Sequence, residues 1–354
     1  EAAKEAAEKN MQVFILGVGS PDGSPIPVER GSNAFRKDKD GNVIVTRLNE
    51  QMCQEIAKAG NGMYIRVDNS NSAEKILNEE IGKLAKELEL SLEGIEIVNL
   101  RHPNEASRRE RYARILAEKR ARQGANFQEA NDKMFERNYF GMMMVETGEA
   151  DAFITGLYTK YSNTIKVAKE VIGIQSGYKH FGTMHILNSK KGTYFLADTL
   201  INRHPDTETL VDIAKLSKET VEFFNQTPVM AMLSYSNFGS DNEGSPAKVH
   251  EAIDIIQREY SDLAIDGEMQ VKFAMNKEAR DERYPFTRLL GKDVNTLIFP
   301  NLSSANATYQ LIQSMSETEV IGPIQMGLNK PIHFTDCEAS VRDIVNITAV
   351  AVID

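Results

Sequence analysis

Residues whose side chains could take part in chemistry gather near the C-terminus, where Ser340 and Asp343 are three positions apart. A serine followed three residues later by an acid, directly before an apolar run, predicts a capping box at the start of a helix. The stretch 322–354 begins as a glycine- and proline-rich loop that leads into this helix start. A helix N-terminus fed by such a loop is a natural seat for an anionic ligand, because free N–H groups point at it. The spacing therefore indicates a candidate anion site.

A second candidate lies in the loop MLSYSNFGSDNEGS that begins at residue 232. Its small and hydroxyl-bearing residues Ser234, Ser236, Gly239 and Ser240 follow an apolar run that predicts a strand. Successive backbone N–H groups in such a loop can cradle a phosphate. An ordinary strand-to-helix connection explains the same pattern, so both interpretations stay open.

A thiol nucleophile is the third candidate, since Cys337 lies close in sequence to His333. The flanking acids Asp336 and Glu338 would raise the pKa of a thiol, which favours an inert small residue over a nucleophile. The remaining histidines show no metal-ligand spacing, so the sequence predicts no metal site.

Alternating strand and helix patterns must position these residues. The expected strands are 13–17, 63–67, 94–98 and 152–155, the expected helices are 48–59, 71–88, 106–122, 127–139 and 164–171, and hairpins join 35–37 to 43–46 and 183–187 to 193–198. Mixed strand–helix alternation with an antiparallel hairpin indicates a three-layer αβα architecture of the α/β class with mainly parallel sheets.

Composition limits the class of protein. The 354 residues allow two or three domains, and a net charge of −10 argues against nucleic acid or an anionic membrane as the main partner. Two cysteines imply no disulfide framework and fit a reducing, cytoplasmic location. No apolar run is long enough to span a membrane, and no signal peptide is present. The chain begins without methionine inside a helical pattern, which suggests a fragment.

An ordered series of motifs carries a family resemblance over residues 80–354. These motifs are GEADAFITG at 148–156, TYFLAD at 193–198, MLSYS at 232–236, IDGEMQ at 265–270, LIFPNLSSANATY at 297–309, GPIQMGLNKP at 322–331 and SVRDIV at 340–345. Together they resemble the phosphate acetyl/butyryltransferase family, and most of all the C-terminal phosphotransacetylase-like domain of hybrid NADP-dependent malic enzymes. The resemblance implies two subdomains flanking a cleft, one formed by 81–171 with 325–354 and the other by 172–324.

The resemblance assigns roles to individual positions. The family's general base falls on Asp343, although capping with Ser340 explains the same aspartate. One phosphate-site arginine of the family falls on Arg120, where a solvated helix face is the alternative. A second family arginine falls on Lys166, which keeps the charge but loses the bidentate fork. Acetyl-CoA or CoA is the implied ligand, with no covalently bound cofactor.

Two positions depart from the family pattern. Where the family carries a serine and an arginine after its KP motif, this sequence has Asp336 and Cys337. Negative charge must develop there during acyl transfer, and losing one oxyanion donor alone costs ~10²–10³ in rate. We therefore expect very weak or absent transfer between CoA and phosphate.

The opening segment 1–80 resembles the C-terminal half of a von Willebrand factor A domain of bacterial aerotolerance proteins. The motif of that family's metal site, Asp-x-Ser-x-Ser, is absent from it. The two resemblances meet within 71–88, which suggests an artificial junction. A natural fusion in which the A-domain fragment completes the sheet is the alternative.

Three functions follow. The first is an acetyl-CoA-binding, catalytically degenerate regulatory domain of a malic enzyme, associated with the malic enzyme catalytic domain of a parent protein and forming homo-oligomers. The second is an active phosphate acetyltransferase. The third is an A-domain-type protein interaction module.

Overall fold

The computed structural model divides into two compact units, Glu1–Val98 and Asn99–Asp354. The structure describes residues 2–8, 13, 15–18, 21–28, 34–67, 82–83, 85–91, 93–156, 161–316, 318–335 and 339–354. The sequence predicted a boundary at 80–81, and that position stays a prediction about where the two family resemblances meet. The predicted helix at 71–88 lies largely outside the described residues.

The first unit is built around a parallel pair of short strands. Its elements are α1 (Ala2–Glu8), β1 (Ile15–Val18), β2 (Ser24–Pro25), β3 (Val45–Thr46), α2 (Glu50–Ala59) and β4 (Tyr64–Val67). Strand β1 pairs in parallel with β4, and the Asn49 side chain caps α2 by accepting from the Met52 N–H at 3.0 Å. An antiparallel bridge between Lys37 and Val43 confirms the first predicted hairpin. Residues 95–98 form no strand, so that expectation was wrong.

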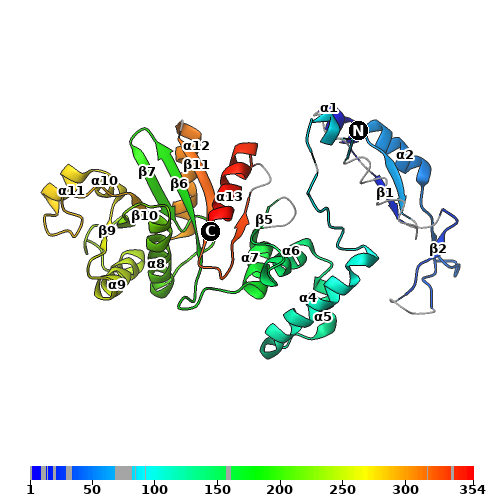
Figure 1. Cartoon of the computed structure of the whole chain (residues 1–354), viewed down its shortest axis with the longest axis horizontal. Coiled ribbons are helices and arrows are strands. Elements are labelled where there is room, and N and C mark those ends of the chain that lie inside the picture. The colour runs from blue at the N-terminus through cyan, green and yellow to red at the C-terminus, as the bar shows by residue number, and fades with distance from the viewer. Residues whose placement is uncertain are drawn as a thin grey trace. The chain divides into compact units, whose positions relative to one another are not determined.

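The second unit contains a six-stranded sheet in the order β11-β6-β7-β10-β8-β9 (Figure 1). Its strands are β6 (Gly182–Ser189), β7 (Gly192–Ala197), β8 (Val229–Leu233), β9 (Ala264–Met269), β10 (Thr296–Ile298) and β11 (Glu319–Met326). The neighbouring strands β7, β10, β8 and β9 pair in parallel, whereas β6 is antiparallel to both β7 and β11. The β6–β7 pair confirms the predicted hairpin, and the mainly parallel sheet confirms the α/β class.

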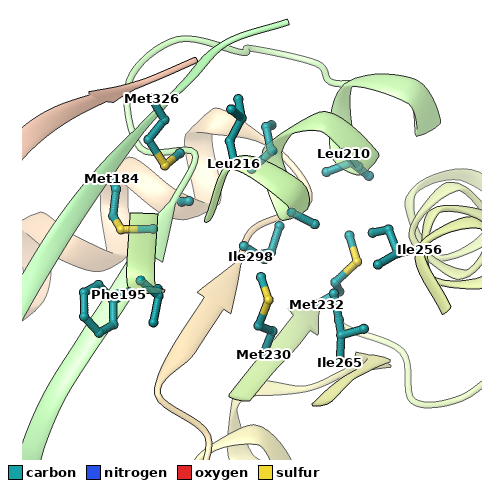
Figure 2. Packing of buried hydrophobic residues seen from close by; sticks show 14 of the residues in the cluster. Met184, Phe195, Leu210, Leu216, Met230, Met232, Ile256, Ile265, Ile298 and Met326 are labelled. Atoms are coloured by element: carbon teal, nitrogen blue, oxygen red, sulfur yellow. The ribbon is translucent and has the colours of Figure 1, made fainter. Parts of the chain in front are cut away.

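Helices cover both faces of this sheet. They are α8 (Thr207–Phe223), α9 (Gly244–Glu259), α10 (Val271–Ala274), α11 (Lys277–Arg283), α12 (Leu302–Met315) and α13 (Val341–Ile353). Successive residues of a strand point to opposite faces. Accordingly, Phe195 of β7 packs in a core with α8 and α9 (Figure 2), while the next residue, Leu196, packs in a second core with α12. Two cores on one sheet are the three-layer arrangement that the sequence predicted.

A smaller parallel pair joins β5 (Phe153–Thr155) to β12 (Ile332–Phe334). The helices associated with this part are α4 (Ala106–Lys119), α5 (Phe127–Lys133), α6 (Arg137–Glu146) and α7 (Tyr161–Val171), with single 3-10 turns η1 (Pro103–Glu105) and η2 (Ala121–Gln123). The predicted single helix 127–139 was wrong, because the chain breaks at 134–136. There Met134 is fully buried and the Phe135 ring lies under the Arg109 guanidinium at 4.7 Å. These tertiary contacts override helix propensity.

Candidate functional site

The start of α13 carries the capping box that the sequence predicted. The Oδ2 atom of Asp343 accepts from the Ser340 N–H at 2.8 Å and from the Ser340 hydroxyl at 2.7 Å. In return, the Ser340 Oγ accepts from the Asp343 N–H at 3.2 Å. Both residues of the candidate anion site are therefore placed at a genuine helix N-terminus. The same geometry makes Asp343 the N3 partner of a cap, as its alternative interpretation required.

The residues that lead into this helix are described only in part. Asp336, Cys337 and Glu338 lie outside the described residues. Before them, Thr335 donates its N–H to the Thr155 carbonyl at 2.6 Å, which holds the end of β12 against β5. The loss of the family's serine and arginine thus rests on the sequence.

A second group surrounds a hollow of about 170 Å³ between α4, α5 and α7, called here the cationic hollow. Arg120, the residue that ends α4, lies in its wall together with Lys133 and Glu170. Among the residues that the structure describes, the Arg120 guanidinium has no hydrogen-bonded or ionic partner. Its role as an anion-binding residue stays a prediction, with the solvated helix face as the alternative.

The second predicted cation, Lys166, lies beside the same group. Its ammonium is 3.8 Å from the Glu170 carboxylate, one helical turn further along α7. Lys133 of α5 approaches Glu170 more closely, at 2.8 Å, and the Tyr139 hydroxyl donates to it at 2.5 Å. The structure therefore brings Arg120 and Lys166 to one neighbourhood, with Glu170 between the positive groups. Lys133 and Glu170 were missed from the sequence, since they lie 37 residues apart.

The hydroxyl-rich loop after β8 donates hydrogen bonds to a buried carboxylate of the same chain. The Gly239 N–H donates to the Oε1 atom of Glu268 at 2.6 Å, and the Ser236 hydroxyl donates to it at 3.1 Å. The Ser234 hydroxyl accepts from the Ser236 N–H at 3.1 Å. Glu268, on β9, is fully buried, so these donors hold a carboxylate from the chain itself. Ser236 and Gly239 therefore donate to Glu268, whereas the Ser234 hydroxyl is bonded within the loop, and phosphate binding by this loop stays a prediction.

A buried polar cluster that sequence reasoning missed lies at the ends of β6 and β7. Asp198, 3% exposed, accepts from the Thr183 N–H and hydroxyl at 3.0 and 2.6 Å. It also accepts from the N–H and side-chain amide of Asn202 at 2.6 and 2.7 Å. These four donors make Asp198 the anchor of the loop after β7. The TYFLAD motif, which ends on this aspartate, was the available signal.

Three further contacts lie around this cluster. The His185 ring stacks on Tyr309 with centroids 4.2 Å apart, and its Nδ1 lies 2.8 Å from the Thr199 hydroxyl. Burial lowers the pKa of His185 to about 3, so the imidazole is neutral near pH 7. The Gln325 amide donates to the Tyr161 hydroxyl at 3.2 Å, which joins β11 to α7.

Chemically, these groups can bind an anion and hold a carboxylate at a helix start. Within the described ranges, no cluster of three His, Cys, Asp or Glu side chains is arranged to hold a metal ion. In that same part of the chain, no helix is both long and apolar enough to cross a membrane.

The second unit is thus a three-layer α/β fold with a cationic hollow and a carboxylate-capped helix start. The chain belongs to the phosphate acetyl/butaryl transferase family, whose model matches residues 69–352. It is 30% identical to the phosphate acetyltransferase of Bacillus subtilis, a match that covers 86% of this chain and 91% of that protein. The phosphotransacetylase structure from Streptococcus pyogenes superposes with a TM-score of 0.70 at 28% identity, over 83% of this chain and 86% of that one.

A second kind of relative is longer than this chain. The NADP-dependent malic enzyme of Salmonella typhimurium is 40% identical over 215 residues, which are 60% of this chain. The match covers 28% of the malic enzyme, so the chain spans little more than a quarter of that relative's length.

A short segment matches a different protein. An aerotolerance-related membrane protein from Bacteroides fragilis is 70% identical over 23% of this chain and 40% of that chain, with a TM-score of 0.22. The overlap is too small for a structural argument. The sequence resemblance of residues 1–80 to the A domain and the origin of the junction rest on the motifs.

Proposed function

We propose that this chain binds acetyl-CoA, or a related phosphate-bearing acyl carrier, in a transferase-type site that has lost most of its acyl-transfer activity. The observation that carries the proposal is the cationic hollow. Arg120 lies in its wall without a described counter-ion, and Lys166 stands beside it on α7. An anion such as a ligand phosphate would supply the missing negative charge.

Loss of transfer is supported by the residues at the start of α13. The base position Asp343 is present and its carboxylate already accepts two hydrogen bonds from Ser340. The positions that align with the family's serine and arginine carry Asp336 and Cys337. A carboxylate placed where an oxyanion must form repels it, and the guanidinium that would offset this is missing.

We further propose that the domain acts as the regulatory part of a malic enzyme, a likeness supported by the 40% identity to the Salmonella typhimurium protein. In that setting its partner would be the malic enzyme catalytic domain, in a homo-oligomer of the cytoplasm. Ligand binding would regulate activity only if it favours one of two conformational states.

An active phosphate acetyltransferase is the second candidate. It is favoured by the Bacillus subtilis relative, which this chain matches over 91% of that protein's length. Retention of Asp343 at the base position is compatible with it.

One pair of measurements separates the two. Titration of the 354-residue chain with acetyl-CoA by calorimetry should show saturable binding, while release of free thiol from acetyl-CoA with saturating phosphate should stay at background. Thiol release that Asp343→Ala abolishes would establish the active enzyme instead. A folded chain that neither binds acetyl-CoA nor releases thiol would refute both.

A further inference from the structure

The wall of the cationic hollow includes a carboxylate that no motif points to. Glu170, on the last turn of α7, has its Oε2 atom 2.8 Å from the Lys133 ammonium and 2.5 Å from the Tyr139 hydroxyl. Its Oε1 atom faces Lys166 at 3.8 Å. One carboxylate thus gathers groups from three helices, α5, α6 and α7.

This carboxylate is held in its charged form. Burial opposes ionisation of Glu170, but the hydrogen bonds from Lys133 and Tyr139 outweigh that effect and hold its pKa below the ordinary value. Near neutral pH the group is therefore a fixed negative charge. It attracts both lysines and keeps their ammonium groups close to the hollow.

The charges around the hollow do not balance. The positive groups are Arg120, Lys133 and Lys166, and the negative groups are Glu129 and Glu170. Lys133 and Lys166 share one carboxylate, that of Glu170, so the two lysines are not fully neutralised. Because Arg120 has no side-chain partner among the described residues, a further anion can bind beside it without displacing one. The hollow has a volume of about 170 Å³, well below the ~300–1,000 Å³ of pockets that enclose a whole drug-sized ligand. It is suited to one anionic group of a larger molecule or to a free ion.

We infer that Lys133 is a third anion-binding residue of this site, which holds a phosphate group together with Arg120, and that Glu170 is the positioning residue that keeps Lys133 at the hollow. The inference rests on the proposed function and extends it, because neither Lys133 nor Glu170 was assigned by motif. An arginine provides a planar fork of donors and a lysine a mobile point charge, a combination that suits phosphate. The phosphate is either one carried by the acyl carrier or inorganic phosphate.

The test compares variants of the complete 354-residue chain by calorimetric titration. Three probes are used: acetyl-CoA, the same compound without its 3′-phosphate, and inorganic phosphate. Lys133→Met removes the charge while keeping most of the side-chain length. Lys277→Met is the matched control, because Lys277 also forms a single ion pair, with Asp293 at 3.0 Å, but lies on α11 outside the hollow.

We expect Lys133→Met to weaken the affinity for at least one of the three probes by ~10-fold or more, the usual size of one charge-assisted hydrogen bond. If the loss is equal with acetyl-CoA and with the compound that lacks the 3′-phosphate, Lys133 holds the diphosphate. The control should bind as the wild type does. If the loss appears with acetyl-CoA and disappears without the 3′-phosphate, Lys133 holds that phosphate. If it appears with inorganic phosphate, Lys133 holds the free ion.

Folding is checked separately, since Lys133 also contributes to structure. Lys133→Arg keeps the charge, so it should recover most of the affinity, and circular dichroism should match the wild type in every variant. Glu170→Gln keeps an acceptor for Tyr139 but removes the negative charge that holds the Lys133 ammonium at the hollow. It should therefore bind phosphate several-fold more weakly, and Lys133→Met should cost less additional affinity in the Glu170→Gln background than in the wild type, a coupling that a purely structural glutamate would not give.

The outcomes separate the two proposals. Wild-type binding that Lys133→Met leaves unchanged overturns the role of Lys133 while the proposed function stands. Absence of wild-type binding to all three probes refutes the proposed function itself. Unchanged or tighter phosphate binding by Glu170→Gln in a folded variant overturns the role of Glu170 as a charged positioning residue.

Discussion

The Oδ2 atom of Asp343 accepts two hydrogen bonds from Ser340, at 2.8 Å from its N–H and at 2.7 Å from its hydroxyl. A carboxylate in this geometry stabilises the first turn of α13. To accept a proton from a thiol through the same oxygen, it would have to give up one of those bonds. A base function exercised through Oδ2 would therefore compete with the cap for that atom.

Replacing Ser340 by alanine tests the strength of this cap. The change removes the acceptor of the Asp343 N–H, and we expect the free energy of unfolding to fall by about 1 kcal/mol. Urea denaturation monitored by circular dichroism measures it. The neighbouring Val341 is 79% exposed, so Val341→Ala serves as control and should change little. Equal stabilities of the two variants would contradict a stabilising cap.

Replacing Asp198 should destabilise the protein far more than replacing Ser340, because the Asp198 carboxylate is the shared acceptor of a buried loop. Asp198→Ala removes the buried carboxylate that accepts from Thr183 and Asn202. We expect a loss of about 3 kcal/mol or more, the usual cost of removing one partner from a buried charged network. Equilibrium denaturation is the measurement, and Asp293→Ala, at a side chain that is 82% exposed, is the control. A loss no larger than that of the control would show that the network contributes little.

His185 predicts a specific pH dependence. Burial lowers the pKa of His185 from the ordinary 6.5 to about 3. Between these two values the imidazole is protonated in the unfolded chain but neutral in the folded chain. Stability is therefore lost as the pH falls from about 6.5 toward 3, by up to about 1.4 kcal/mol per pH unit. In His185→Gln this contribution should be absent. Denaturation at pH 7, 6 and 5 measures the free energy of unfolding of both proteins. The wild type should lose stability faster than His185→Gln as the pH falls, so the difference between the two should change from pH 7 to pH 5. Parallel losses would count against it.

Gly156 directly follows β5, and its backbone lies very close to Thr335, which directly follows β12. A methyl group on Gly156 would lie 2.1 Å from the carbonyl oxygen of Thr335, which is backbone and cannot move aside cheaply. Gly156→Ala should lower the free energy of unfolding by 1–3 kcal/mol, as overpacking usually does. Thermal unfolding measures the change. Gly82, which has no atom of the described residues within 4 Å of the equivalent position, supplies the control, and Gly82→Ala should not lower the melting temperature.

Parts of the site were predictable because they depend on neighbours in sequence. The cap between Ser340 and Asp343 spans three residues, so spacing alone predicted it, and the structure confirms both of its hydrogen bonds. The β6–β7 hairpin is equally local. The break in the predicted helix 127–139 was missed, because its cause is the contact of Phe135 with Arg109 from another helix.

Which charges pair was decided by the tertiary structure. The donors of Ser236 and Gly239 were recognised in sequence, but their acceptor is Glu268, about 30 residues later. Lys133 meets Glu170 only because α5 and α7 lie on either side of one hollow.

The amino-acid sequence alone determined the α/β class, the helix cap at Ser340 and the order of motifs that indicates the transferase family. Periodicity and capping act within a few residues, where the chain has little freedom. Only the tertiary structure showed that Glu268 holds the hydroxyl-rich loop and that Glu170 gathers the lysines of the hollow. Ion pairs between distant residues depend on how helices pack against a sheet, and each long charged side chain has several acceptors within reach until that packing selects one.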